Sequence, residues 1–257
     1  MDLGLKDQGA VVIGGAQGIG QAIAQAFAAE GSRVGIMDLA PSGEFEAEIS
    51  VDATDYDAVC EAASQLVEKL GAVHHVVFAA GIGSGKFGFP FWNLDPSDWK
   101  RVIDVNLIGA ANAAHAFAPV LTEQRAGTML FLTSVAGQVG SQTDPPYSAA
   151  KAGVINFMQC AAKDFAKFNV RANCIAPGMV KTSLNQSVWA AGQQLLDEAN
   201  RQSYDDWAAE KIGTIAPLGR WQQVEEFGAA AIFLASEKAK NITGQTINVD
   251  GGQVMHS

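Results

Sequence analysis

Short apolar segments rich in valine, isoleucine and leucine alternate along the chain with longer segments in which apolar residues recur every three or four positions. The short segments are typical of buried strands, and the longer ones are typical of helices with one apolar face. Strands are predicted near 10–13, 33–37, 48–51, 75–79, 127–132, 170–175 and 245–249. Helices are predicted near 18–29, 55–70, 97–123, 147–167 and 222–235, with a lid region within 183–212.

The same alternation predicts an α/β fold, a doubly wound parallel sheet of about seven strands flanked by helices. No internal repeat or linker divides the sequence, so residues 1–257 are expected to form a single domain. Ligands of such folds bind beyond the carboxyl ends of the strands. Five residues follow predicted strands at that edge, namely Gly14, Asp38, Ala80, Ser134 and Pro177.

A glycine-rich turn separates the first predicted strand from the first predicted helix, with Gly14, Gly18 and Gly20 in the spacing G-x-x-x-G-x-G. Glycines allow a sharp turn and let a pyrophosphate reach the N–H groups at the start of a helix. A turn with no binding role would show the same pattern. Asp38 lies 18 residues beyond Gly20, where a carboxylate can accept hydrogen bonds from an adenosine ribose. Turn and carboxylate together indicate a nucleotide site.

Tyr147 and Lys151 are four positions apart in a predicted helix, so their side chains share one face. A phenol has a pKa near 10, and a neighbouring ammonium favours the phenolate. The pair is therefore expected to bring the pKa of Tyr147 toward neutral pH, as an acid/base catalyst requires. A solvated helix face would carry the same two residues, and the nucleotide signature favours the catalytic interpretation.

With these motifs the chain resembles the short-chain dehydrogenase/reductase family over nearly its whole length. Further matches to the family pattern are Asp52, Ala80 and Gly81, Asn106, Ser134, Pro177 and Gly178 with Thr182, and the ending Val249, Asp250, Gly251 and Gly252. The resemblance implies a Rossmann-type fold and an NAD(H)-dependent oxidoreductase. Its implied reaction interconverts a secondary alcohol and a ketone by hydride transfer.

The resemblance also implies a catalytic tetrad of Asn106, Ser134, Tyr147 and Lys151. Tyr147 would be the general acid/base, Ser134 would hold the substrate oxygen, and Lys151 would lower the pKa of Tyr147 and bind the nicotinamide ribose. Asn106 would anchor a water that links Lys151 to solvent. The implied cofactor-binding residues are Gly14, Gln17, Gly18, Ile19, Gly20, Asp38, Asp52, Ala53, Ala80, Gly81, Tyr147, Lys151, Pro177, Gly178, Val180 and Thr182.

Asp38 predicts NAD(H) rather than NADP(H), because its carboxylate would repel the additional 2′-phosphate. Gln17 and Leu39 stand where NADP-using relatives tend to carry a basic residue.

Three features depart from the family pattern. Ile13 replaces a threonine that ties down the glycine-rich turn, and Phe78 and Ala79 replace two asparagines that brace the central sheet. These changes bear on local stability more than on chemistry. The segment 39–51 is short and contains a proline and a glycine, so the helix found there in relatives is expected to be truncated or absent.

The composition indicates a globular cytoplasmic protein without a catalytic metal. At 257 residues and a net charge of −10, with no basic cluster, the chain is not expected to bind nucleic acid or a membrane. The four histidines show no ligand spacing. Cys60, Cys160 and Cys174 are expected to be reduced, buried thiols.

The small-molecule substrate is open between a polyol, a hydroxy ketone and an alicyclic alcohol. Aromatic residues in 83–95 and 182–214 could form an apolar pocket wall, or they could pack in a subunit interface or in the lid's own small core. Asp144 could contact a substrate hydroxyl or cap the following helix. The segment 182–214 is predicted to be a mobile lid, with a fixed helical insertion as the alternative.

A homotetramer is expected, because the helices near 97–123 and 147–167 carry small and apolar residues around much of their circumference. These residues are Ala110, Ala111, Ala113, Ala114, Phe117, Ala152, Val154, Phe157 and Met158. A non-catalytic dinucleotide-binding sensor or scaffold of the same fold is the alternative function. A sensor has no need of Tyr147 and Lys151 together, which favours the enzyme.

Overall fold

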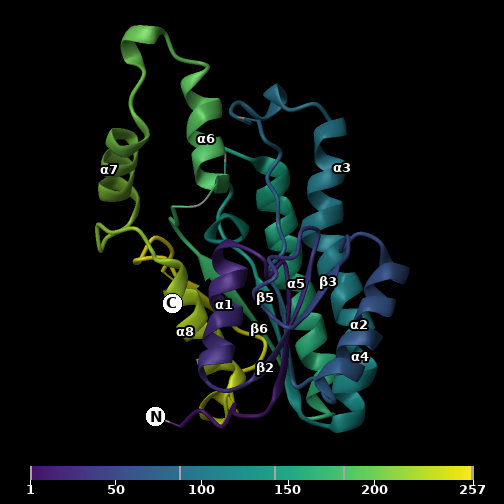
Figure 1. Cartoon of the computed structure of the whole chain (residues 1–257). Helices are drawn as coiled ribbons and strands as arrows, with labels where there is room; N and C mark the ends of the chain where they lie inside the picture. The colour runs from purple at the N-terminus through teal and green to yellow at the C-terminus, as the bar shows by residue number, and fades with distance from the viewer. Residues whose placement is uncertain (1, 87, 142, 182, 256–257) are drawn as a thin grey trace.

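A seven-stranded parallel sheet forms the centre of the molecule (Figure 1), with the strand order β3-β2-β1-β4-β5-β6-β7. The computed structural model describes residues 2–86, 88–141, 143–181 and 183–255. The strands are β1 (Gly9–Ile13), β2 (Arg33–Asp38), β3 (Ala47–Ser50), β4 (His75–Phe78), β5 (Gly127–Leu132), β6 (Val170–Pro177) and β7 (Thr246–Val249). Each predicted strand is found within two residues of its expected bounds, which confirms the doubly wound sheet.

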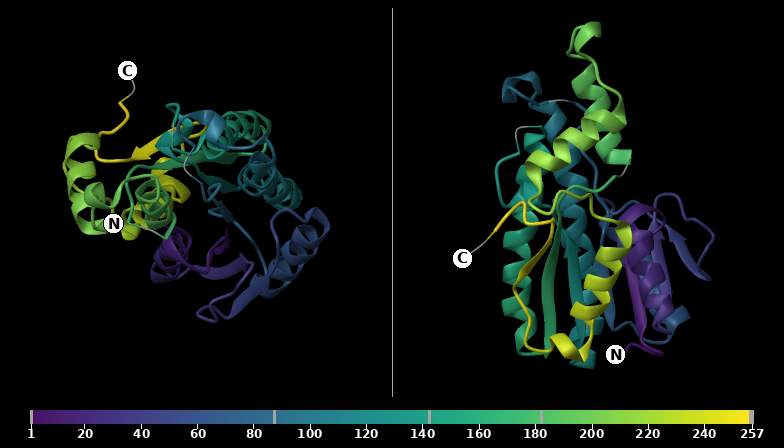
Figure 2. Two further views of the ribbon diagram at one scale, coloured as in Figure 1. Left: turned by 90° about the horizontal axis from the view of Figure 1, so that it is seen from above. Right: turned by 90° about the vertical axis from the view of Figure 1, so that its left-hand side faces the viewer.

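Helices cover both faces of the sheet, as the two views of Figure 2 show. The helices are α1 (Gly18–Ala29), α2 (Tyr56–Leu70), α3 (Ser97–Ile103), α4 (Gly109–Gln124), α5 (Pro145–Ala166), α6 (Ser183–Gln193), α7 (Tyr204–Ile215) and α8 (Val224–Ala235). Alternate residues of β1 point to opposite faces, so Val12 packs against α1 and α8 while Val11 packs in the core under α2, α4 and α5. The apolar strands are therefore buried on both sides.

The predicted helix 97–123 is interrupted by a π-helical turn at Asp104–Ile108, between α3 and α4. A π turn inserts one extra residue into the helical path and often marks a functional site. Asn106 lies in this turn and is fully buried. A pattern of period 3.6 gives no sign of such an insertion.

The segment between β2 and β3 contains no helix, as its short length predicted. The Glu48 carboxylate instead holds this segment in place, because it accepts hydrogen bonds from the N–H groups of Gly43, at 2.9 Å, and Phe45, at 2.7 Å. These bonds lower the pKa of Glu48 despite an opposing effect of burial.

At the end of β4, Phe78 stands where the family pattern has an asparagine that braces the central sheet, and it packs in the apolar core. Phe78 is fully buried, and a Cβ atom at Gly109 would come within 3.2 Å of its ring. The absence of a side chain at Gly109 therefore makes room for the ring at the end of β4.

The segment 182–214, which is predicted to be a lid, stands above the carboxyl ends of the strands (Figure 1). Its described part contains helices α6 and α7. A short helical turn at Glu198–Asn200 lies in the connection between the two helices. The prediction of helix within 183–212 is confirmed, and α7 extends three residues further.

The three cysteines are free, but only Cys174 is buried. Cys60 is half-buried and Cys160 is exposed, so the expectation of three buried thiols is wrong. Both lie on helices whose outer faces meet solvent, whereas Cys174 lies in β6, between β5 and β7. In the described part of the chain, no helix is long and apolar enough to cross a bilayer.

Candidate active site

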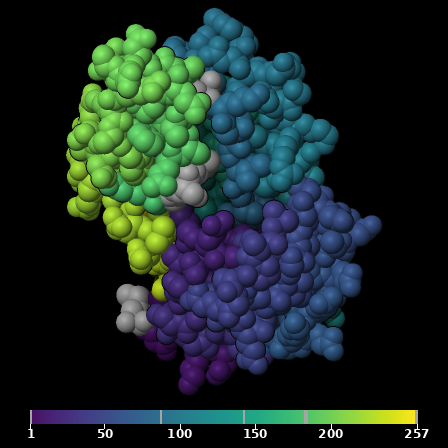
Figure 3. Space-filling model, turned by 45° about the horizontal axis from the view of Figure 1, so that its top comes forward, coloured from purple at the N-terminus to yellow at the C-terminus, as the bar shows by residue number. Residues whose placement is uncertain are grey.

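A cavity of about 650 Å³ lies beyond the carboxyl ends of the strands, under the lid. The loops that follow β1, β2, β4, β5 and β6 line it, as expected for a parallel sheet. Figure 3 shows the lid (green) and residues of about 83–100 (blue-teal) on opposite sides of a hollow in this face of the molecule. Every predicted cofactor-binding residue except Thr182 lines the cavity, and Thr182 lies outside the described residues.

The glycine-rich turn presents backbone to the cavity, and two of its glycines leave no room for a side chain. A Cβ atom at Gly14 would lie 2.5 Å from the Ala80 nitrogen, and one at Gly20 would lie 2.0 Å from the Gly14 oxygen. Gly14 also has a positive φ of 79°. Helix α1 begins directly after this turn, so its first N–H groups form an anion-binding end. The turn fits the pyrophosphate of a dinucleotide.

The Asp38 carboxylate lies at the end of β2 and lines the cavity. Its two oxygens accept hydrogen bonds from the N–H groups of Ala16 and Ala40, each at 3.1 Å. These bonds fix the carboxylate between the glycine-rich turn and Leu39, where a ribose diol can be bound.

Asp52 lies on the neighbouring wall, beside Ala53. Its Oδ1 atom accepts hydrogen bonds from the N–H of Thr54, at 2.9 Å, and from the Thr54 hydroxyl, at 2.8 Å. These hydrogen bonds lower the pKa of Asp52, and the positive charge of Arg101 lowers it further. The carboxylate is thus held ionised at neutral pH.

Tyr147 and Ser134 both line the cavity. Burial raises the pKa of Tyr147 to about 12, while the Ser134 side chain lowers it and the charge of Asp144 raises it. The expectation that Lys151 brings this pKa toward neutral is therefore wrong for the structure as it stands. The Lys151 Nζ atom is 5.5 Å from the centre of the Tyr147 ring, and burial of the phenol outweighs it.

Lys151 is buried, and its Nζ atom donates a hydrogen bond to the Leu132 carbonyl at 2.8 Å. Burial lowers the pKa of Lys151 to about 8. Asn106 lies behind it and donates to the carbonyls of Ile82, at 2.8 Å, and Val102, at 2.9 Å. The Asn106 Oδ1 atom is buried and has no partner among the described protein atoms.

The unpartnered Asn106 oxygen and the Lys151 ammonium face the same point. A Cβ atom at Gly81 would lie 2.8 Å from Asn106 Oδ1 and 3.1 Å from Lys151 Nζ. Only a glycine at position 81 leaves that space open. The space is bordered by an acceptor, Asn106 Oδ1, and a donor, Lys151 Nζ, and therefore suits a water molecule.

Asp144 is the cap of α5, which confirms one of its two predicted roles, and it also lines the cavity. Its Oδ1 atom accepts from the Tyr147 N–H at 3.4 Å, and its Oδ2 atom accepts from the Ser84 N–H at 2.7 Å. Burial raises its pKa above the usual range. The carboxylate thus fixes the first turn of the helix that carries Tyr147.

The aromatic residues that the structure describes in segments 83–95 and 182–214 do not form the cavity wall. Phe89, Phe91 and Trp92 are 50%, 67% and 71% exposed and lie outside the lining. Trp189 and Tyr204 of the lid pack on each other with ring centres 5.7 Å apart. The lid's own small core is therefore the correct alternative for its aromatic residues.

The lining residues that were not predicted from the sequence include the polar side chains of Arg101, Lys181, Asn185 and Lys211. Lys181 directly follows the predicted site residue Val180, so its place in the sequence could have identified it as a lining residue. Arg101 and Lys211 carry no recognisable motif and reach the cavity only through the packing of α3 and α7.

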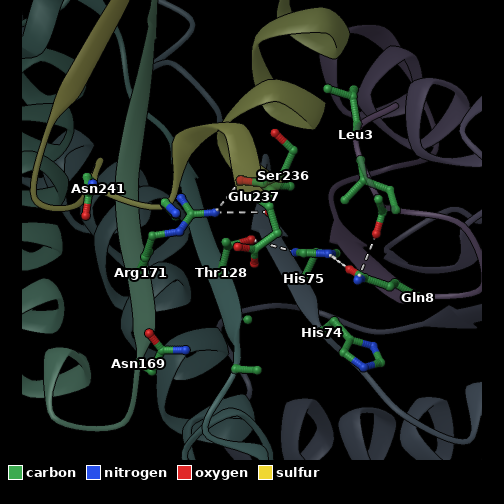
Figure 4. A pocket seen from close by; sticks show the side chains of 16 residues that line it. Leu3, Gln8, His74, His75, Thr128, Asn169, Arg171, Ser236, Glu237 and Asn241 are labelled. Carbon is green, nitrogen blue, oxygen red and sulfur yellow. Dashed lines mark hydrogen bonds between the residues drawn. The ribbon is translucent and has the colours of Figure 1, made fainter. Parts of the chain in front are cut away.

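A second cavity, of about 270 Å³, lies at the amino ends of the strands (Figure 4). The buried His75 ring bridges the Thr128 hydroxyl, at 2.8 Å, and the Gln8 side chain, at 2.5 Å. The Arg171 guanidinium donates to carbonyls at the end of α8, including Ala235 at 3.0 Å and Ser236 at 3.1 Å. The polar side chains of His75 and Arg171 thus have hydrogen-bond partners within the protein, which indicates a structural role for this cavity.

His75 predicts a loss of stability in acid. Burial lowers its pKa to about 3, whereas the unfolded chain binds this proton near the ordinary value of 6.5. Between these values the unfolded chain binds more protons, so the free energy of unfolding should fall with decreasing pH by up to about 1.4 kcal/mol per unit from this group. His75→Gln should be less stable than wild type at pH 8 but lose less stability between pH 6 and pH 4.

Urea unfolding at pH 8, 6, 5 and 4 measures this difference, with His115→Gln on the exposed face of α4 as the control. A wild-type advantage over His75→Gln that stayed constant with pH would contradict the assignment.

The comparisons with known proteins agree with this geometry. A family model described as enoyl-(acyl carrier protein) reductase matches residues 14–254. The chain is 35% identical to an acetoacetyl-CoA reductase of Synechocystis sp., and the match covers 98% of each chain. It is 33% identical to a 2-dehydro-3-deoxy-L-rhamnonate dehydrogenase (NAD(+)) of Sphingomonas sp., over 95% of this chain and 94% of that one. The ligand-free structure of Thermoplasma acidophilum aldohexose dehydrogenase superposes with a TM-score of 0.89 at 28% identity, covering 100% of this chain and 98% of the other.

Proposed function

The chain belongs to the short-chain dehydrogenase/reductase family, and we propose that it uses NAD(H) to interconvert a secondary alcohol and a ketone with Tyr147 as the acid/base. One observation carries the proposal: Ser134, Tyr147 and Lys151 open into the same cavity as the glycine-rich turn and Asp38. The bound nicotinamide would accept or supply the hydride.

The residues of this chain supply the proton and the alignment. In alcohol oxidation Tyr147 takes the hydroxyl proton, and in ketone reduction it donates the proton to the carbonyl oxygen. Ser134 holds the substrate oxygen next to Tyr147 through its hydroxyl. Lys151 would bind the nicotinamide ribose. The water that we place beside Gly81, between Asn106 and Lys151, would pass this proton toward solvent.

The fit of the cavity supports a dinucleotide. The turn from Gly14 to Gly20 and the start of α1 suit a pyrophosphate, Asp38 suits the adenosine ribose, and Asp52 with Ala53 lies by the adenine. Pro177 is the last residue of β6 and Gly178 follows it, and both line the cavity together with the catalytic residues, where the nicotinamide would lie. The sensor alternative is disfavoured, because the relatives are named as reductases and dehydrogenases and because Ser134, Tyr147 and Lys151 of this chain line one cavity.

The substrate itself stays open at this level, since relatives are named for compounds as different as acetoacetyl-CoA and 2-dehydro-3-deoxy-L-rhamnonate. The test is a panel of secondary alcohols and ketones, with NADH formation or consumption followed by absorbance. Turnover by the wild type and none by Tyr147→Phe supports the proposal, and a panel without turnover contradicts it. We also propose that the enzyme works in the cytoplasm, where its three free thiols stay reduced.

We propose a homotetramer, but on a smaller apolar surface than the sequence suggested. Among the residues expected on that surface, Ala110, Ala113, Ala114, Phe117, Val154 and Met158 are buried against the sheet. Ala111, Ala152 and Phe157 remain half-buried or exposed on α4 and α5, with Ile108 44% exposed beside them. Light scattering at micromolar concentration should give four times the mass of the chain. A monomeric mass would refute the proposal.

We propose that the lid, 182–214, becomes ordered when cofactor and substrate bind. It is attached to the core through the segment that follows Gly178 and through the chain after α7, and few contacts join α6 and α7 to the sheet. Amide hydrogen exchange should slow in α6 and α7 of the ternary complex. Unchanged exchange would favour a fixed insertion.

A further inference from the structure

Two lysines of the lid region, Lys181 and Lys211, line the catalytic cavity. Aromatic rings hold both ammonium groups. The Lys211 Nζ atom is 4.2 Å from the centre of the Trp207 ring, and the Lys181 Nζ atom is 5.9 Å from the centres of Tyr204 and Trp221. Cation–π contacts of this kind fix the position of a flexible side chain.

The rings themselves form a continuous stack, which makes the two lysines parts of one structure. Tyr204 and Trp207 stack with centres 5.9 Å apart, and Trp207 and Trp221 lie 6.5 Å apart. The Trp221 indole also donates a hydrogen bond to the Ala208 carbonyl at 3.2 Å. The stack joins α7 to the segment before α8, so both ammonium groups are held at the cavity by the fold.

The charges of the two lysines are balanced differently. Lys181 pairs with Asp205 at 3.7 Å, and the pair has no net charge. Lys211 is half-buried, and no carboxylate of a described residue lies within 4 Å of its Nζ atom. Burial lowers its pKa to about 8, so it is mostly protonated at neutral pH. Lys211 thus presents to the cavity a cation without a carboxylate partner, in a chain whose net charge is −10.

Other charged groups of the cavity have interactions within the protein, and Arg101 is close enough to the Asp52 carboxylate to lower the pKa of that group. Asp144 accepts two backbone hydrogen bonds, and Lys151 donates to the Leu132 carbonyl. Taking an ammonium out of water costs free energy unless an anion or acceptor replaces the water. Lys211 therefore lacks a partner that a ligand can supply, and its single charge matches a monoanion.

We propose that Lys211, supported by Lys181 and the aromatic stack, binds a carboxylate of the substrate, so that the enzyme acts on secondary hydroxy acids and the corresponding keto acids. This inference rests on the proposed oxidoreductase function and narrows its substrate class. A phosphate ester is less well matched, because a dianion requires more donors than one uncompensated ammonium.

Matched substrate pairs test the proposal. The panel contains lactate, 3-hydroxybutyrate and 4-hydroxypentanoate, each beside its methyl ester, with glycerol 3-phosphate beside glycerol. The wild type should favour the best acid over its ester at least tenfold in kcat/KM. Lys211→Met should reduce kcat/KM for that acid at least tenfold and change the ester less than twofold, and Lys211→Arg should keep most of the preference.

Lys238→Met removes the same charge from an exposed site after α8 and should change nothing. Equal losses for acid and ester in Lys211→Met would overturn the proposal. So would a loss confined to the KM for NAD⁺, which would assign Lys211 to the cofactor's diphosphate. Preference for glycerol 3-phosphate over every acid would show that the bound group is a phosphate.

A binding measurement separates this inference from the proposed reaction. Trp207 contacts Lys211, so 3-hydroxybutyrate should change the tryptophan fluorescence of the wild type with NAD⁺ present, and should not change that of Lys211→Met. Binding of 3-hydroxybutyrate without turnover of any alcohol would support the anion site and contradict the oxidoreductase function. Turnover of neutral alcohols without carboxylate binding would support the reaction and contradict the anion site.

Discussion

Replacing Tyr147 by phenylalanine is expected to lower kcat by about 10²–10⁴-fold, which is the typical contribution of a general acid/base. Tyr147 lines the cavity together with Ser134, and the substitution removes only the phenol oxygen. No other phenol lines the described part of the cavity, so no equivalent group replaces the lost proton carrier. The ring keeps its place on α5, and binding of NADH should be nearly unchanged.

The measurement is kcat with the best substrate of the panel, together with the dissociation constant for NADH from its fluorescence. Tyr56→Phe is the matched control, because Tyr56 lies on α2 outside the cavity and should tolerate the same change. A Tyr147→Phe enzyme that kept more than a tenth of the wild-type kcat would show that another group transfers the proton.

NAD(H) is expected to be preferred over NADP(H) by roughly a hundredfold or more in kcat/KM. The Ala16 and Ala40 N–H groups hold the Asp38 carboxylate at the ribose end of the cavity. A 2′-phosphate about 4 Å from this carboxylate would cost on the order of 4 kcal/mol at a surface-like dielectric constant. Leu39, the next residue, is 61% exposed and offers no positive charge in compensation.

Asp38→Asn keeps the shape and an acceptor oxygen but removes the charge. It should reduce the preference for NAD(H) at least tenfold, mainly by raising kcat/KM with NADP(H). Asp52→Asn is the control, because the proposed site places Asp52 by the adenine and its loss should affect both cofactors alike. Equal kcat/KM values for the two cofactors in the wild type would sink this prediction.

The sequence by itself determined the fold, because strands buried on both faces must be short apolar runs and the helices between them must have an apolar face. It also determined the placement of the predicted site, since glycines such as Gly14 and the residues that end parallel strands meet at one edge for topological reasons. The missing helix before β3 followed from the short segment 39–51 alone.

Only the tertiary structure decided the electrostatics of the site. Burial sets the pKa of Tyr147 at about 12 and that of Lys151 at about 8, and burial depends on every element packed around the two side chains. The π-helical turn that carries Asn106 likewise has no periodic signature. Lys211 reaches the cavity because α7 packs through Trp207 and Trp221, a contact between segments that local sequence patterns cannot specify.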